Sequence, residues 1–244
     1  FSWARRYCGA VQTYAGRSVG YVWDFSGASN LDELYESLQS VMLRRLKKDV
    51  LPELPDILYT DEPVGLDNAR EYRRAQDDFK AWYAEKGRYA AVVEHLQQLT
   101  ALRQLAVAGK VAGLLERLEA FREEGKKAIV FCGFLKEGLD KVAAGLEPGE
   151  YVRITGAESA EDRQAAVDDF QSRPGCLFVL GSTLAAGVGI TLTAADTVLF
   201  LDLPWTPGAY EQAVARAHRI GQARGVRVVN MLGRGTVDEA MAGV

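Results

Sequence analysis

The sequence predicts an α/β fold in which a parallel sheet is flanked by helices and preceded by a mostly helical N-terminal region. Two observations in the second half support the sheet: short apolar, β-branched runs alternate with amphipathic stretches, and those runs are apolar almost throughout. The first half is charged and shows little alternation, which favours helices there.

The expected elements of the second half follow one another closely. Ser159 and Asp162 form a capping box that starts one helix, and Pro207-Gly208 starts another. Strands are expected at 128–131, 151–155, 176–180, 197–202 and 226–231, and helices at 110–123, 135–146, 159–171 and from 207 onward. In the first half, residues 31–49 and 67–105 have helical patterns, and Pro52 and Pro55 break the chain between them.

The composition excludes several classes of protein. The chain has 244 residues, 48% of them hydrophobic, and a formal net charge of -4, so nucleic-acid binding would need a local basic stripe. Cys8, Cys132 and Cys176 match no metal spacing and are expected to be reduced, and with only His95 and His218 no metal site is expected. No apolar run has the length of a membrane span.

The most informative residues are Gln212, Arg216 and Arg219. On one helix their spacing puts them within about 60° of one another. Two guanidiniums on a rigid element suit the stabilisation of negative charge during phosphoryl transfer, although an Arg-rich helix face is more often solvated surface. The apolar residues expected on the opposite, buried face are Tyr210, Ala213, Val214 and Ala217.

Loops that follow predicted strands are the next candidates, because ligands of parallel sheets bind at the carboxyl ends of strands. Each such loop could also be an ordinary turn, and Trp205 could be a core residue. The candidates are Thr155 and Gly156, Ser182 and Thr183, Gly187 and Gly189, and Trp205. No Gly-x-x-x-x-Gly-Lys-Ser/Thr loop and no acidic box for magnesium occur, so the chain by itself is not expected to be a complete nucleotide hydrolase.

Together these residues resemble the Swi/Snf-type double-stranded DNA translocases of helicase superfamily two, over nearly the whole chain. Residues 212–222 look like the family's sixth helicase motif, residues 182–196 like the fifth, and residues 127–131 like the fourth. The Trp205-Thr-Pro207 corner, the connector 43–55 and the segment 235–239 also resemble family segments.

The resemblance implies a RecA-like second helicase lobe and a role for each candidate. Arg216, Arg219 and Gln212 would act on ATP, with Gly187 and Gly189 near the nucleotide. Thr155, Gly156, Ser182, Thr183 and Trp205 would contact duplex DNA. ATP and Mg²⁺ would be held mainly by a first lobe preceding Phe1, so the chain alone is expected to be inactive and to bind no cofactor.

The resemblance also divides the chain and suggests its setting. Residues 1–60 would be the first-lobe tail and connector, 61–108 a helical insertion, and 109–244 the RecA-like lobe. The expected partners are double-stranded DNA and the N-terminal lobe of the same protein, with no membrane and a monomer expected. The location would be the nucleus in a eukaryote, or the cytoplasm with the nucleoid in a bacterium.

Two other readings remain. Leu184 and Ala186 replace the Arg and Gly of many family members, as in the annealing-helicase branch, and with the acidic balance they allow a non-catalytic DNA- or protein-binding module. A phosphate-binding loop encoded upstream of Phe1 would favour the DNA translocase over the non-catalytic module. An oxidoreductase is disfavoured because no Gly-x-Gly-x-x-Gly is present.

Overall fold

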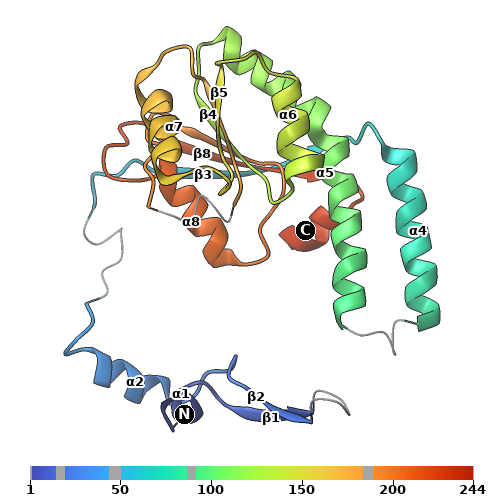
Figure 1. Ribbon diagram of the computed structural model, residues 1–244, viewed down its shortest axis with the longest axis vertical. Helices are drawn as coiled ribbons and strands as arrows, with labels where there is room; N and C mark the ends of the chain where they lie inside the picture. Colours follow the sequence, from blue (N-terminus) through green and yellow to red (C-terminus); the bar gives the residue numbers. More distant parts are fainter. Residues whose placement is uncertain (1, 15–19, 44–50, 87–91, 184–188, 244) are drawn as a thin grey trace. The chain divides into compact units, whose positions relative to one another are not determined.

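The computed structural model describes residues 2–14, 20–43, 51–86, 92–183 and 189–243 (Figure 1). The chain divides into two compact units, Phe1–Pro52 and Glu53–Val244. Among the described helices none is long and apolar enough to cross a membrane.

The first unit contains two helices and a hairpin. They are α1 (Ser2–Tyr7), the antiparallel strands β1 (Val11–Tyr14) and β2 (Tyr21–Asp24), and α2 (Leu31–Leu38). Glu33 joins the two helices, because its carboxylate accepts hydrogen bonds from Arg6 Nε (2.8 Å) and Tyr7 Oη (2.8 Å). The hairpin is a departure from the helical expectation. No described residue of this unit is buried, so polar contacts rather than an apolar core hold its elements together.

The second unit is built on a six-stranded, wholly parallel sheet, as the sequence predicted. The strand order is β3-β8-β7-β4-β6-β5. The strands are β3 (Ile57–Val64), β4 (Ala128–Phe131), β5 (Tyr151–Ile154), β6 (Phe178–Gly181), β7 (Thr197–Phe200) and β8 (Val226–Gly233). Helices flank the sheet, which gives the RecA-like architecture (Figure 1).

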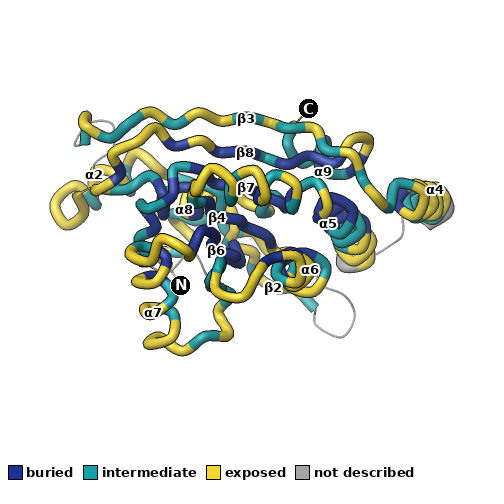
Figure 2. Tube along the Cα trace, turned by 90° about the horizontal axis from the view of Figure 1, so that it is seen from above, coloured by how far each residue is buried: buried dark blue, intermediate teal, exposed yellow. Residues whose placement is uncertain are grey.

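Strand β3 lies at one edge of the sheet and was not predicted. It pairs with β8 along its whole length, from Ile57 opposite Val226 to Val64 opposite Gly233. Figure 2 shows β3 largely exposed and β8 largely covered. The expected boundary at residue 60 therefore falls inside a strand of the sheet, and the compact unit begins at Glu53. The functional division of the chain stays a prediction.

Two apolar cores cover the two faces of the sheet, because side chains of each strand alternate between them. The residues of one strand, Ile129 and Val130, belong to different cores. One core contains α5 (Val92–Glu123), the π-helical turn η1 (Leu135–Leu139) and α6 (Asp140–Ala144), and the other contains α7 (Ala160–Ser172) and α8 (Pro207–Ala217). Ser159 caps α7 through the amide of Asp162 (3.0 Å), as predicted.

Helix α5 is longer than predicted and runs through residue 108 without a break. It replaces the separate elements expected on either side of that residue. Helix α4 (Ala69–Lys86) lies beside its first half in Figures 1 and 2, and Tyr72 packs with Leu102 and Ala106 between them. The last helix, α9 (Val237–Ala242), is tied to α5 by a buried ion pair between Lys110 and Asp238 (2.6 Å).

Candidate functional site

The arginine-bearing helix α8 begins where the sequence predicted. Thr206 is the N-cap, whose Oγ1 accepts a hydrogen bond from the amide of Ala209 (3.3 Å), and Pro207 occupies the first turn. The helix ends at Ala217, so Arg216 lies in its last turn and Arg219 lies beyond it. The expectation that both arginines share one regular helix is wrong, because the backbone of His218 leaves the helical region at φ -85° and ψ 79°.

Arg216 and Arg219 are nevertheless close enough to influence each other. Burial, and after it the positive charge of Arg219, lowers the pKa of the Arg216 guanidinium from its usual value. An arginine remains charged at neutral pH, so two positive charges lie near the end of α8. Arg216 is only 8% exposed, whereas Gln212, one turn earlier, is exposed. The predicted stripe is therefore partly buried, and its apolar neighbours Ala213 and Val214 do lie in the core.

Two hydrogen bonds place this pair at the edge where the strands begin. The amide of Leu192 donates to the carbonyl oxygen of Arg216 (2.9 Å), and residue 192 precedes the start of β7. Nε2 of His218 lies 2.8 Å from the carbonyl oxygen of Pro55, just before β3. Helix α8 thus returns from the carboxyl edge of the sheet to the amino edge and carries the arginines with it.

The segment that follows Arg219 is held by a buried glutamine, Gln222. Its Nε2 donates to the carbonyl oxygens of Ala195 (2.8 Å), Thr193 (3.2 Å) and Ala217 (3.3 Å). The preceding Gly221 has φ +98°, a conformation that favours glycine. Gln222 therefore fixes the end of α8 against the loop that precedes β7.

Thr155, Gly156, Ser182 and Thr183 meet at the opposite, carboxyl edge. Ser182 Oγ donates to the carbonyl oxygen of Thr155 (3.1 Å), because β5 and β6 are neighbours in the sheet. Ser182 and Thr183 are 8% and 7% exposed, whereas Gly156 is exposed and Thr155 half-buried. Only part of the predicted DNA-contact set is thus open to a ligand in this structure.

Trp205 also lies on the carboxyl side and is not a core residue, since it is 55% exposed. Its ring stacks on the guanidinium of Arg103, with Cζ 4.2 Å from the ring centroid. Arg103 in turn forms a buried ion pair with Asp202 (2.7 Å), whose other oxygen accepts a hydrogen bond from the amide of Gly133 (3.3 Å). The loops after β4 and β7 are therefore fastened to α5.

The remaining predictions concern the glycines and metals. Gly187 lies outside the described residues, and Gly189 has φ +42° on the way to the amino edge. The described part of the chain contains no group of three or more His, Cys, Asp or Glu that could hold a metal ion.

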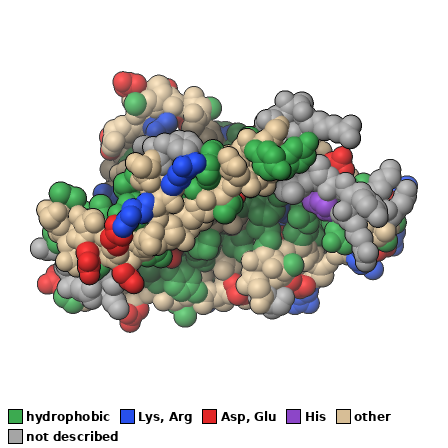
Figure 3. All heavy atoms as spheres, turned by 90° about the horizontal axis from the view of Figure 1, so that it is seen from below, with side chains coloured by type: hydrophobic (Ala, Val, Ile, Leu, Met, Phe, Trp, Pro, Cys, Tyr) green, Lys and Arg blue, Asp and Glu red, His purple; other side chains and the backbone are tan. Residues whose placement is uncertain are grey.

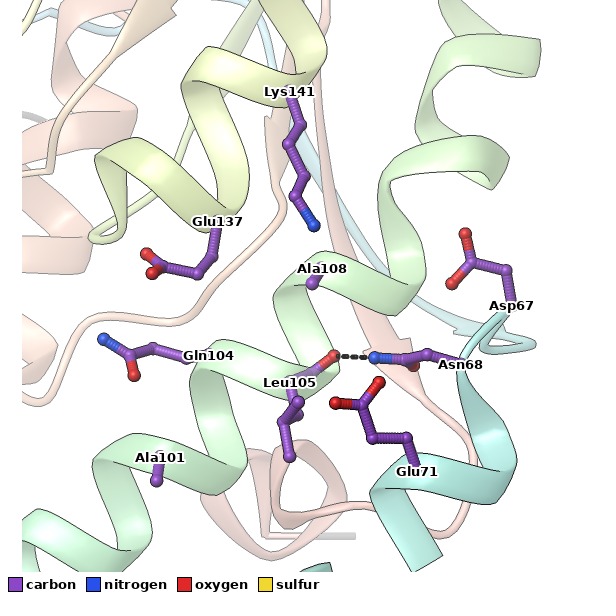
Figure 4. Close-up of a pocket in the computed structure, with 9 residues that line it drawn as sticks. All are labelled: Asp67, Asn68, Glu71, Ala101, Gln104, Leu105, Ala108, Glu137 and Lys141. Carbon is purple, nitrogen blue, oxygen red and sulfur yellow. Dashed lines mark hydrogen bonds between the residues drawn. The ribbon is translucent and has the colours of Figure 1, made fainter.

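A surface cavity of about 490 Å³ lies elsewhere, between the start of α4, the middle of α5 and η1. Figure 4 shows Asp67, Glu71 and Glu137 around it, with Lys141 above. Three carboxylates against one ammonium disfavour nucleotide phosphates there. This cavity contains none of the predicted site residues.

The surface view agrees with a local rather than a global basic site. Figure 3 shows a face of the molecule that carries Lys and Arg as well as Asp and Glu side chains.

Sequence reasoning assigned no role to four residues that shape these edges: Arg103, Glu158, Asp202 and Gln222. Arg103 and Asp202 are 99 residues apart in the sequence, so no local pattern pairs them. Gln222 stands inside the predicted sixth motif, which was a usable signal. Glu158 follows the Thr155-Gly156 pair after one intervening residue, Ala157, and its carboxylate binds that loop.

Comparison with known proteins identifies the family of the chain. Residues 109–221 match the family model described as the helicase conserved C-terminal domain. The chain carries the C-terminal lobe of a SWI/SNF-type helicase. The match spans α8 and both arginines, and the sheet has the fold expected of a SWI/SNF-type lobe.

Relatives of this SWI/SNF-type lobe include annealing helicases. The chain is 34% identical, over 99% of its length, to the human protein named DNA annealing helicase and endonuclease ZRANB3. It is 35% identical over 96% of its length to the Xenopus laevis SWI/SNF-related matrix-associated actin-dependent regulator of chromatin subfamily A-like protein 1. The chain spans 22% and 24% of the lengths of these two proteins.

Among solved structures, the SWI/SNF-type lobe is similar to the Sulfolobus solfataricus SWI2/SNF2 ATPase core in complex with dsDNA. The TM-score is 0.63 at 26% sequence identity, and the similarity covers 88% of this chain and 50% of that one. The RecA-like lobe predicted from the sequence is confirmed.

Proposed function

We propose that this chain is the part of a DNA-dependent ATPase that supplies two arginines to ATP and contacts the backbone of duplex DNA. The observation that carries the proposal is the position of the two arginines: Arg216, buried in the last turn of α8, and Arg219, just beyond that helix, lie at the amino edge of the sheet beside the loop that precedes β7. The conserved helicase domain match and the DNA-bound archaeal relative support it.

In the proposed mechanism Arg216 and Arg219 stabilise negative charge that develops on the terminal phosphates of ATP. Partial burial strengthens this effect, since a less polar surrounding screens charge poorly. Gln212 is exposed one turn before Arg216 and helps to orient the phosphates. Gly187 and Gly189 would bring bare backbone amides to the nucleotide; Gly189 is the one of the two that lies among the described residues.

In this proposal ATP and Mg²⁺ bind at a site that is shared between this chain and a first lobe. Mg²⁺ would neutralise the phosphates, and the first lobe would supply its ligands while this chain supplies the guanidiniums. The first lobe would likewise hold most of the ATP. We therefore expect the 244-residue chain alone to hydrolyse no ATP and to bind DNA weakly. Turnover by the purified chain that Arg219→Ala removes would contradict this division.

DNA contacts are proposed at the carboxyl edge. Thr155 and Gly156 present a hydroxyl and backbone amides, and Trp205 presents an exposed ring beside Arg103. Ser182 and Thr183 complete the set of proposed DNA contacts. Ser182 contributes by holding Thr155 in place, because its hydroxyl donates to the carbonyl oxygen of Thr155. Such backbone contacts read no sequence, so binding should be non-specific and sensitive to salt. A nuclear or nucleoid location follows from this partner.

The nucleotide proposal is tested in the full-length protein. Arg216→Ala and Arg219→Ala should each abolish DNA-stimulated ATP hydrolysis while circular dichroism stays unchanged. Arg74→Ala is the matched control, because Arg74 is an exposed arginine on α4 and belongs to neither of the two proposed sites. Near-normal turnover in both Arg216→Ala and Arg219→Ala would exclude the role proposed for the arginines.

A further inference from the structure

The loop after β5 already holds an anion, the carboxylate of Glu158. Its Oε2 accepts hydrogen bonds from the amides of Thr155 (2.8 Å) and Gly156 (2.8 Å). Its Oε1 accepts a hydrogen bond from the hydroxyl of Thr155 (2.7 Å). The two oxygens thus take all three donors of the loop.

These three donors have the geometry of an anion cradle. The amides of Thr155 and Gly156 converge on one oxygen, Oε2 of Glu158, and successive amides that point at one anion form a typical phosphate-binding nest. Gly156 has φ +94°, a backbone conformation that favours glycine. Ser182 fixes the loop from the neighbouring strand by donating to the carbonyl oxygen of Thr155 (3.1 Å). A phosphate, like a carboxylate, only accepts hydrogen bonds, so the two groups suit the same donors.

The surroundings favour negative charge at this point. Burial alone would raise the pKa of Glu158, but hydrogen bonds from Thr155 and Gly156 together lower it below its usual value. Nη2 of Arg163 lies 3.4 Å from the carbonyl oxygen of Glu158, which brings a guanidinium behind the loop. Nε of Arg163 is buried and has no hydrogen-bond partner among the described residues.

We propose that Glu158 is an internal substitute for a DNA phosphate, filling the cradle of Thr155 and Gly156 in the absence of DNA and leaving it when a phosphate enters. The inference rests on the proposed DNA contact at Thr155 and Gly156, and it adds that Glu158 regulates this contact. Release of Glu158 opposes binding twice, because three hydrogen bonds break and a carboxylate remains near the incoming phosphate. Glu158 thereby lowers the affinity for DNA and makes it easier for the cradle to release one DNA phosphate and bind the next.

The test compares binding of a fluorescent duplex DNA to the chain and three variants at low salt. Glu158→Ala empties the cradle, and Glu158→Gln keeps the size of the side chain but removes its charge. Glu161→Ala is the matched control, since it removes an equal charge from an exposed position in the first turn of α7. Glu158→Ala should bind roughly tenfold more tightly than the parent, and Glu158→Gln less so, while Glu161→Ala changes little.

Other outcomes separate the two proposals. Equal gains in Glu158→Ala and Glu161→Ala would reduce the effect to net charge, and unchanged or weaker binding in Glu158→Ala and Glu158→Gln would make Glu158 a structural brace. Either result overturns the inference and leaves the DNA contact standing. Absence of binding in every variant would overturn the DNA contact itself.

A second measurement observes the cradle directly. In nuclear magnetic resonance spectra, titration with inorganic phosphate should move the amide signals of Thr155 and Gly156 in Glu158→Ala but not in the parent chain. Signals that stay still in both proteins would contradict an anion cradle.

Discussion

The guanidinium of Arg103 lies 2.7 Å from the carboxylate of Asp202, with both side chains almost fully buried. Nη2 of Arg103 also donates to the carbonyl oxygen of Leu203 (2.5 Å), and the guanidinium stacks under Trp205. A single side chain on α5 thus fixes the loop after β7 and the exposed aromatic ring that it presents.

Arg103→Met should therefore lower the free energy of unfolding by about 3–5 kcal/mol, because it leaves Asp202 buried without its cation. Burial already raises the pKa of Asp202, which the charge of Arg103 opposes. Urea unfolding followed by circular dichroism measures the loss. Arg117→Met is the control on the same helix: its pair with Glu62 is partly exposed and should cost about 0–1 kcal/mol. Equal losses in the two variants would refute the special role of Arg103.

The three cysteines should differ sharply in reactivity. Burial raises the pKa of Cys132 to about 12 and raises that of Cys176 as well, whereas Cys8 is partly exposed. Because the thiolate is the reactive form, a disulfide reagent at about pH 8 should modify Cys8 in the native chain and the other two only in denaturant. Mass spectrometry of the labelled peptides identifies the sites. Rapid native labelling of Cys132 would contradict the described core.

Much of the sheet could be predicted because its central strands are apolar on both faces. Strand β3 was missed for a physical reason: at the edge it is exposed, and its Asp61, Glu62 and Pro63 disguise the strand pattern. Proline is tolerated there because an edge strand leaves amides unpaired. The continuity of α5 was hidden by Gly109, which is helical and closely faced by Asn68 and Leu66.

The candidate site residues were chosen from the sequence, whereas their arrangement is seen only in the folded chain. Arg216 and Arg219 were recognised from spacing, yet the turn at His218 depends on tertiary contacts with Pro55 that no helical period contains. Their separation from Thr155 could have been foreseen, since a helix joining parallel strands runs back to the opposite edge. The partners Arg103 and Asp202 could not, because only the folded chain brings them together.

The cradle of Glu158 should be visible in an acid titration. A carboxylate whose pKa is lowered by folding stabilises the fold above its unfolded pKa, and that contribution is lost as pH falls through the lower, folded pKa. The amide signals of Thr155 and Gly156 should therefore titrate with a midpoint below the usual value of about 4.3. The same titration of Glu158→Gln should be flat. A midpoint at or above the usual value would contradict the hydrogen bonding described.

Gln222 is predicted to position the arginines rather than to act on the nucleotide. Gln222→Leu removes three donations to backbone carbonyls and should lower the free energy of unfolding by about 1–3 kcal/mol.

Gln171→Leu is the control, because Gln171 braces the same loop through the amide of Ala194 (2.8 Å), and its side-chain hydrogen bonds to the described residues go to that loop rather than to α8. Both variants should lose stability, while only Gln222→Leu should reduce DNA-stimulated ATP hydrolysis of the full-length protein. Arg216→Ala should remove the ATPase activity with a smaller loss of stability than Gln222→Leu. This difference would distinguish a residue that acts on ATP from a residue that positions it. If Gln171→Leu and Gln222→Leu reduced turnover equally, general loosening of the loop, not the placement of Arg219, would explain the effect.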